Sequence, residues 1–264
     1  MHALDHAVGA LIRRVAADIV MPRFRTLAAA DIVEKSPGEL VTIADREAEV
    51  ALTAGLSAIN PTARVIGEEA VATDPTLLDA IGTGRLWLVD PVDGTANFAA
   101  GREPFGIIVA LVENGVPLAS WIFDPVNDRM CHAASRAGSY ANGKRLTATG
   151  SGAARPIMSI GTHLMTPAQA DLFEKKVEGQ LDLVPSPRCA AENYPRLVLG
   201  KNDVALFARG LPWDHAAGAL FLAEAGGKVA WNDGTPYRVG DRQASLLAAA
   251  SPALWDQAAA ILFA

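Results

Sequence analysis

The stretch from Leu86 to Val89 is an apolar run that ends in two aspartates, Asp90 and Asp93, followed at once by Gly94. Short continuous apolar runs are typical of strands buried on both faces. Asp-Pro and Asp-Gly steps are common in turns, so the stretch predicts a core strand ending in a turn that carries two carboxylates. The rest of the chain decides whether that turn is only a surface feature.

Composition limits the classes of function. The chain has 264 residues, half of them hydrophobic, and can bury a large core. Its formal net charge of −6 argues against a nucleic-acid-binding surface. An acidic protein that handles phosphate needs added positive charge, usually from divalent cations. Cys131 and Cys189 form no zinc or disulfide pattern, and we see no signal peptide or membrane-spanning run, so we expect a cytoplasmic protein.

Periodicity and turn residues predict the order of the elements. Apolar residues at helical spacing predict a helix over residues 8–20, and Thr42 with Asp45 predicts the capped start of a helix that runs to Ile59. Asn114-Gly115 between two apolar runs predicts a β-hairpin. Further strands are expected at 64–66, 130–134, 156–161, 202–207 and 245–250, and further helices near 167–179, 191–199, 214–225 and 252–262.

Antiparallel strands come first, and strands alternate with helices later, which indicates a mixed, layered α+β fold. We expect a single domain over residues 1–264 with two sub-halves. The stretch 148–156, TATGSGAAR, is the candidate join between them.

Carboxylates stand where several predicted elements begin or end: Asp45, Glu68, Asp90, Asp93 and Asp214. Taken singly, each has a structural explanation as an exposed acid, a turn residue, a helix N-cap or part of a capping box. Taken together, they supply what a pair of Mg²⁺ ions needs, which is several carboxylates converging on one pocket.

The turn after the apolar run supplies further ligands. The proline between Asp90 and Asp93 restricts the backbone, so both side chains can face one small volume, and the Val92 carbonyl is a further oxygen. Gly94 permits an unusual backbone conformation, and its amide and that of Thr95 can hold a phosphate oxygen. The spacing is suited to a two-metal site for phosphoryl transfer.

Four segments resemble the inositol monophosphatase family of lithium-sensitive, Mg²⁺-dependent phosphatases. In the family's order they are KSPGELVTIAD at 35–45, GEE at 67–69, WLVDPVDGTANF at 87–98 and WDHAAGALFLAEAGG at 213–227. The resemblance implies a layered αβαβα sandwich and a homodimer. It also implies a phosphomonoesterase that acts on a small polyol or sugar-like phosphate, with inositol monophosphate the first candidate.

The same resemblance implies the metal ligands. Glu68, Asp90 and the Val92 carbonyl would bind one Mg²⁺. Asp90, Asp93 and Asp214 would bind a second, and a third, weaker ion would lie near Glu68.

It also implies the residues that act on water and phosphate. Thr95, paired with Asp45 and close to Glu68, would position the attacking water and help to deprotonate it. The amides of Gly94 and Thr95 would cradle the phosphate. Lys35 matches the pattern more loosely and receives no role.

The substrate side departs from the family pattern. Relatives often carry a histidine where this chain has Ala100, and inositol-specific members often carry a glutamate where this chain has Phe207. A phenyl ring accepts no hydrogen bond from a hydroxyl, so specificity for inositol is in doubt. Arg188 and Glu192 are the candidate substrate-binding residues, and Arg209 is a further polar candidate.

Several alternatives stay open. Histidinol phosphate, fructose 1,6-bisphosphate and, more weakly, 3′-phosphoadenosine nucleotides are alternative substrates, and a regulatory or binding protein that retains the fold is the alternative of another class. Residues 138–145 almost fit a P-loop, but Arg145 replaces the required Ser or Thr, so we expect a surface turn there. His215 is interpreted as structural.

Overall fold

The computed structural model describes residues 4–36, 38–161, 165–241, 243 and 245–263. Its larger sheet has seven strands in the order β3-β4-β5-β6-β7-β8-β9, with β3 parallel to β4 and the later pairs antiparallel. In this order the strands are Arg64–Gly67, Arg85–Asp93, Gly106–Glu113, Val116–Asp124, Arg129–Ala134, Gly138–Ala141 and Lys144–Leu146.

A smaller sheet has five strands in the order β11-β10-β12-β14-β13, and β10 is parallel to both of its neighbours. Its strands are, in that order, Asp182–Pro185, Ile157–Ile160, Val204–Phe207, Leu246–Ala249 and Lys228–Trp231. A separate ribbon pairs β1 (Ile32–Ser36) with β2 (Glu39–Thr42).

The helices cover the faces of these two sheets. Their bounds, from α1 to α8, are Asp5–Val15, Ile43–Ile59, Glu68–Thr73, Thr95–Ala99, Pro167–Val177, Ala190–Val198, Pro212–Glu224 and Pro252–Leu262. Among the described residues, no helix is long and apolar enough to cross a lipid bilayer.

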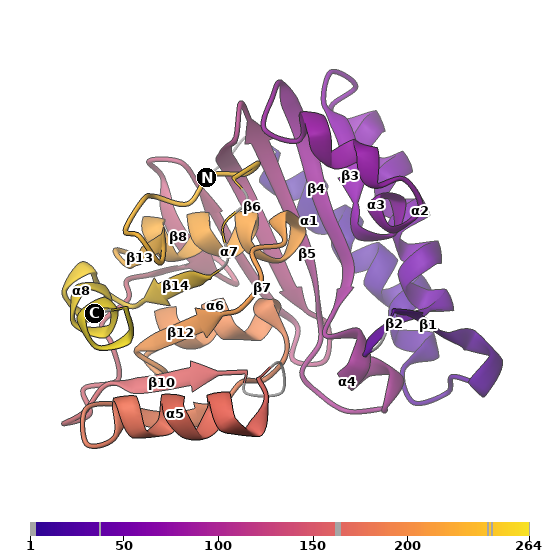
Figure 1. Cartoon of the computed structure of the whole chain (residues 1–264). Helices are drawn as coiled ribbons and strands as arrows, with labels where there is room; N and C mark the ends of the chain where they lie inside the picture. The colour runs from indigo at the N-terminus through magenta and orange to yellow at the C-terminus, as the bar shows by residue number, and fades with distance from the viewer. Residues whose placement is uncertain (1–3, 37, 162–164, 242, 244, 264) are drawn as a thin grey trace.

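Alternate residues of β4 face opposite sides of the large sheet, as the pleat of a strand requires. Leu86 and Leu88 pack with residues of α6 and α7, whereas Trp87 and Val89 pack with residues of α1 and α2. α5 and α8 cover the outer face of the smaller sheet (Figure 1). The layers therefore run helix, sheet, helix, sheet, helix, which confirms the predicted αβαβα sandwich.

The strongest local signals are confirmed. Asn114 and Gly115 have φ values of 49° and 78° and form the two-residue turn between β5 and β6. The Thr42 hydroxyl accepts the N–H of Ala44, and the Asp45 carboxylate accepts the N–H of Thr42 at 2.8 Å. This capping box starts α2 one residue after Thr42.

Two expectations need correction, and one element was not expected. The predicted helix over 8–20 is an α-helix only to Val15, and the next five residues form a wider π-helical turn. Residues 138–145 are mostly strand, because β8 and β9 form a hairpin around Asn142-Gly143. The ribbon over residues 32–42 was not predicted at all. The stretch 148–156 lies between β9 and β10, where the chain passes from one sheet to the other.

Candidate active site

The two aspartates at the end of the apolar run lie in the strand itself and not in the predicted turn. Asp90 and Asp93 pair with residues 108 and 106 of β5, so β4 has one extra residue between the two pairs. Residues three apart on a regular strand point to opposite faces. This β-bulge therefore brings both carboxylates to the face that packs on α6 and α7, and it turns Val92 to the other face.

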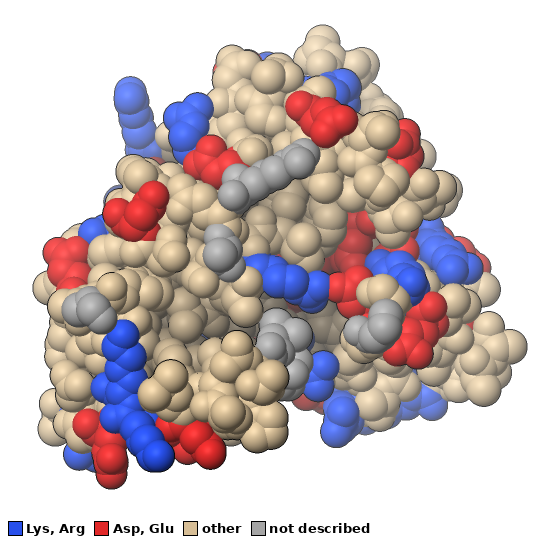
Figure 2. Space-filling model, in the orientation of Figure 1, with Lys and Arg blue, Asp and Glu red and all other residues tan. Residues whose placement is uncertain are grey.

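Five carboxylates of the described residues line one cleft of about 880 Å³, namely Glu39 of β2 and four that were predicted from the sequence, which come from three other elements. Glu68 begins α3, Asp90 and Asp93 belong to β4, and Asp214 lies in the first turn of α7. Asp90 and Asp93 are 2% and 8% exposed, whereas Glu68 and Asp214 are partly exposed. Figure 2 shows acidic and basic side chains around the hollow near the centre of this face.

The environment of these groups opposes their ionisation. Burial raises the pKa of Asp90 and Asp214 well above the ordinary value, and the charges of the other carboxylates raise it further. Burial also raises the pKa of Asp93, although the hydrogen bonds to its carboxylate lower it. Burial raises the pKa of Glu68 as well, although the positive charge of Lys35 beside it lowers that pKa. A hard divalent cation bound among these groups would favour their ionised forms and offset the repulsion between them.

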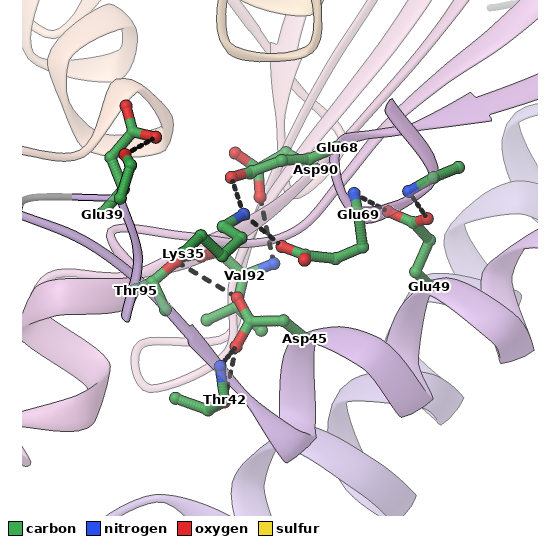
Figure 3. Close-up of polar contacts among 12 residues, drawn as sticks. Lys35, Glu39, Thr42, Asp45, Glu49, Glu68, Glu69, Asp90, Val92 and Thr95 are labelled. Carbon is green, nitrogen blue, oxygen red and sulfur yellow. Dashed lines mark hydrogen bonds and ion pairs between the residues drawn. The ribbon is translucent and has the colours of Figure 1, made fainter. Parts of the chain in front are cut away.

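Lys35 of β1 brings positive charge to this cluster. Its ammonium lies 2.8 Å from Glu68 Oε1 and 2.8 Å from Glu69 Oε1 (Figure 3). Burial lowers the pKa of Lys35, but these two carboxylates raise it above its ordinary value. Within the described ranges, no three His, Cys, Asp or Glu side chains are gathered closely enough to ligate one ion as they stand.

Thr95 and Asp45 meet at the edge of this cluster. The Thr95 hydroxyl lies 3.1 Å from Asp45 Oδ1 and 2.9 Å from the Val92 carbonyl oxygen (Figure 3). Asp45 is almost fully buried, and burial raises its pKa to about 7. The structure thus brings together the threonine and the aspartate that the sequence paired.

The backbone reverses direction at Gly94 to begin α4. Gly94 has a φ of +83°, and its carbonyl oxygen accepts the N–H groups of Asn97 and Phe98 at 2.8 and 3.1 Å, which starts the helix. Asn97 of α4 donates from Nδ2 to the carbonyl oxygens of Pro104 and Pro187, both at 2.9 Å. These bonds fix α4 against the connection that leads into α6.

We expect Gly94→Ala to destabilise the protein more than a matched glycine substitution. A Cβ at Gly94 would lie 3.0 Å from the Pro104 carbonyl oxygen and 3.2 Å from Cys189 Cβ, in addition to the left-handed φ. Gly84 also has a left-handed φ, of +69°, but has open space around it. Gly84→Ala should lower the free energy of unfolding by about 1–2 kcal/mol. Gly94→Ala should lower it by about 1 kcal/mol more. Urea unfolding of both variants tests this, and equal losses would contradict it.

Glu49 is a site residue that sequence reasoning missed. Its two carboxylate oxygens accept the N–H groups of Glu69 and Ala70, both at 2.8 Å, and so hold the start of α3 that carries Glu68 (Figure 3). The available signal was its spacing, because Glu49 lies four residues after Asp45 on one helix face. The N–H of Ala191, which donates to Asp93 Oδ2 at 2.6 Å, had no such signal.

The candidate substrate residues have different positions. Arg188 lines the cleft, but Glu192 does not. The Glu192 carboxylate pairs with Arg129 and Arg196, and despite burial these partners lower its pKa. The Glu192 side chain therefore links α6 to β7, and the expectation that it binds substrate stays a prediction.

Phe207 lines the cleft from the end of β12, within an aromatic group. Its ring is stacked on that of Tyr194, with 5.4 Å between the ring centroids. It lies edge-to-face with the His215 ring, with 4.6 Å between the centroids. His215 Nε2 lies 2.8 Å from the Arg209 carbonyl oxygen, which can only accept, so Nδ1 accepts the Tyr194 hydroxyl proton. His215 thus orders the β12–α7 connection, in keeping with its structural interpretation.

Comparison with known proteins places these features in one family. A model of the inositol monophosphatase family matches residues 3–262. The chain is 30% identical to an inositol-1-monophosphatase of Bacillus subtilis, with 77% of each chain covered. It is 29% identical to a fructose-1,6-bisphosphatase/inositol-1-monophosphatase of Thermotoga maritima, with 75% of each covered. It is 31% identical to a Pseudomonas aeruginosa protein named Nus factor SuhB, with 78% of each covered.

The fold is also similar to that of solved structures. An inositol monophosphatase of Thermotoga maritima superposes with a TM-score of 0.82 and 25% identity, over 100% of this chain and 97% of that one.

Proposed function

The chain belongs to the inositol monophosphatase family and is a phosphatase, a phosphoric monoester hydrolase, and from this we propose that it hydrolyses a small polyol or sugar-like phosphate in a Mg²⁺-dependent reaction. The observation that carries the proposal is the meeting of Glu68, Asp90, Asp93 and Asp214 in one cleft. Those carboxylates lie beside the Thr95–Asp45 pair and the start of α4.

The oxygen-rich cluster fits Mg²⁺, which prefers carboxylate and carbonyl oxygens. Glu68, Asp90 and the Val92 carbonyl would hold one ion, and Asp90, Asp93 and Asp214 a second, with a third near Glu68. Magnesium bound there would make water more acidic and offset the charge of the phosphate. The mutual charge of these carboxylates supports this assignment.

The chain's own groups would orient the reactants. Thr95 Oγ can accept a hydrogen bond from the attacking water while its own proton is donated to Asp45. The N–H groups of Gly94 and Thr95 would hold phosphate oxygens, because the left-handed turn at Gly94 starts α4 there. Asp45 is held in place by its own bonds from Thr42.

Inositol monophosphate is the first candidate by family membership, and fructose 1,6-bisphosphate and histidinol phosphate are the alternatives. A homodimer is part of the proposal, because the family resemblance implies one. The relative named Nus factor SuhB favours one function of another class, a regulatory protein that retains the fold.

Phosphate release from a panel of these substrates tests the proposal. We expect release that requires Mg²⁺ and is inhibited by Li⁺, with the rate restored when Mg²⁺ is added back after chelation. Chelated protein serves as the control for each substrate. Release from none of them at any Mg²⁺ concentration would contradict the phosphatase proposal for this cleft and favour the regulatory reading.

A further inference from the structure

The side of the cleft formed by the smaller sheet and its connections differs from the carboxylate side. Its lining includes two arginines and apolar side chains: Ile160, Arg188, Leu206, Phe207, Arg209 and Leu211. The described residues that line this side, from β10, β12 and the connections into α6 and α7, include no carboxylate. Glu39 of β2 reaches this side, but its carboxylate already accepts from Arg209 and Ser36. Among the described residues, a polyhydroxylated leaving group would therefore find no unpaired carboxylate there.

Arg188 has an unusual backbone conformation. Its φ is +55°, in the left-handed region that disfavours side chains with a Cβ. The turn is held on both sides, because Arg188 N donates to Ser186 Oγ at 3.1 Å and Asn97 donates to the Pro187 carbonyl oxygen. The turn is therefore fixed against α4, which carries the phosphate-binding amides.

Arg188 lines the cleft and is exposed, and its guanidinium makes no hydrogen bond or ion pair with any residue that the structure describes. Arg209 differs, because its guanidinium pairs with Glu39 of β2. Arg188 therefore leaves an uncompensated positive charge on this side. Backbone strain of this kind clusters at ligand-binding sites, and the exposed guanidinium is accessible to an anion that enters the cleft.

We propose that Arg188 binds a second anionic group, a phosphate or a carboxylate, on the leaving group of the substrate. The inference rests on the proposed function and narrows its substrate class. The reacting phosphate has its own partners in the α4 amides and the cations that the carboxylates would hold. A second anion near Arg188 would meet a planar, bidentate donor. Phe207, which lines the same cleft, would pack against the carbon skeleton that joins the two groups.

This inference reorders the candidates. Fructose 1,6-bisphosphate, whose leaving group is anionic, precedes inositol monophosphate, whose leaving group is neutral. Histidinol phosphate comes last, because its cationic leaving group would meet the free guanidinium of Arg188.

Matched substrate pairs test the inference. Fructose 1,6-bisphosphate is compared with fructose 1-phosphate, and 2-phosphoglycerate with glycerol 2-phosphate, so that each pair differs in one anionic group. We expect kcat/KM to be about tenfold higher for the anionic member in at least one pair, as expected for one charge-assisted hydrogen bond. This advantage should shrink as salt is raised. The inference would be overturned if kcat/KM were no higher for the anionic member of either pair. It would also be overturned if inositol monophosphate were cleaved and neither pair were cleaved.

Variants of Arg188 assign the effect to its charge. Arg188→Gln should remove most of the roughly tenfold advantage. Arg188→Gly should do the same and unfold at no lower temperature than the wild type, because glycine relieves the left-handed strain. Arg155→Gln is the matched control, since Arg155 pairs with Asp182 outside the cleft lining.

Two further outcomes decide the matter. An equal loss of kcat/KM for both members of a pair in Arg188→Gln would overturn the inference, because Arg188 would then serve the reacting phosphate. Release from none of the substrates by the wild type would overturn the proposed function itself and, with it, this inference.

Discussion

Replacing Asp93 by Asn should abolish turnover while the fold remains intact. Asp93 lies on the bulge of β4 among four carboxylates and is assigned to the second Mg²⁺. Because metal ions stabilise the charge that develops on the phosphate, we expect phosphate release to fall by about 10³-fold or more. Asparagine keeps an oxygen that can accept the N–H of Ala191. It also removes one of several repelling charges, so the chelated variant should unfold at no lower temperature than the chelated wild type.

Thermal unfolding with and without Mg²⁺ separates binding from turnover. At a Mg²⁺ concentration of 100 times its Kd, the wild type should gain about 2.7 kcal/mol of stability. Asp93→Asn should gain much less. Asp256→Asn is the matched control, because Asp256 pairs with Lys228 and lies outside the cleft lining. Near wild-type turnover in Asp93→Asn would show that the metal assignment is wrong.

Replacing Thr95 by Ala should slow turnover while Mg²⁺ binding is preserved. The Thr95 side chain is not among the assigned metal ligands, and its hydroxyl joins Asp45 to the Val92 carbonyl oxygen. Loss of a group that positions water and receives its proton should lower kcat by about 10²–10⁴-fold. The stabilisation by Mg²⁺, followed by thermal unfolding, should stay close to that of the wild type.

Thr95→Ser supplies the conservative control. Serine retains the hydroxyl, so it should restore most of the kcat that Thr95→Ala loses. A serine variant as slow as the alanine variant would show that the methyl group, and hence packing at the start of α4, matters more than the hydroxyl. The assigned role of Thr95 would then be wrong.

Local sequence signals were sufficient for most of the secondary structure. The capping box of Thr42 and Asp45 starts α2, and Asn114-Gly115 forms the turn of its hairpin. Each of these signals acts over a few residues, through a side-chain cap or a backbone conformation that few residues adopt. The short ribbon of β1 and β2 was missed because its apolar pattern is weak: no residue of β1 is buried, and in β2 only Val41 and Thr42 are.

The sequence motifs also identified the residues that the structure brings into one cleft. Asp90, Asp93 and Asp214 were selected because they stand at the ends of apolar segments, and they line the cleft together with Glu68. Their separate roles as metal ligands stay predictions. Glu192 was selected by its place in the chain, but its carboxylate pairs with Arg129, which lies 63 residues before it, and no local pattern indicates that pairing.

The sequence by itself determined which chemical groups the chain carries and, through its motifs, the family and the layered fold. Only the tertiary structure decided where those groups point. The single extra residue between Asp90 and Asp93 turns both carboxylates to one face, and it is visible only in the register of β4 against β5. The free guanidinium of Arg188 likewise depends on the turn that Asn97 holds from α4. Side-chain direction depends on partners distant in sequence, and a local pattern carries no record of them.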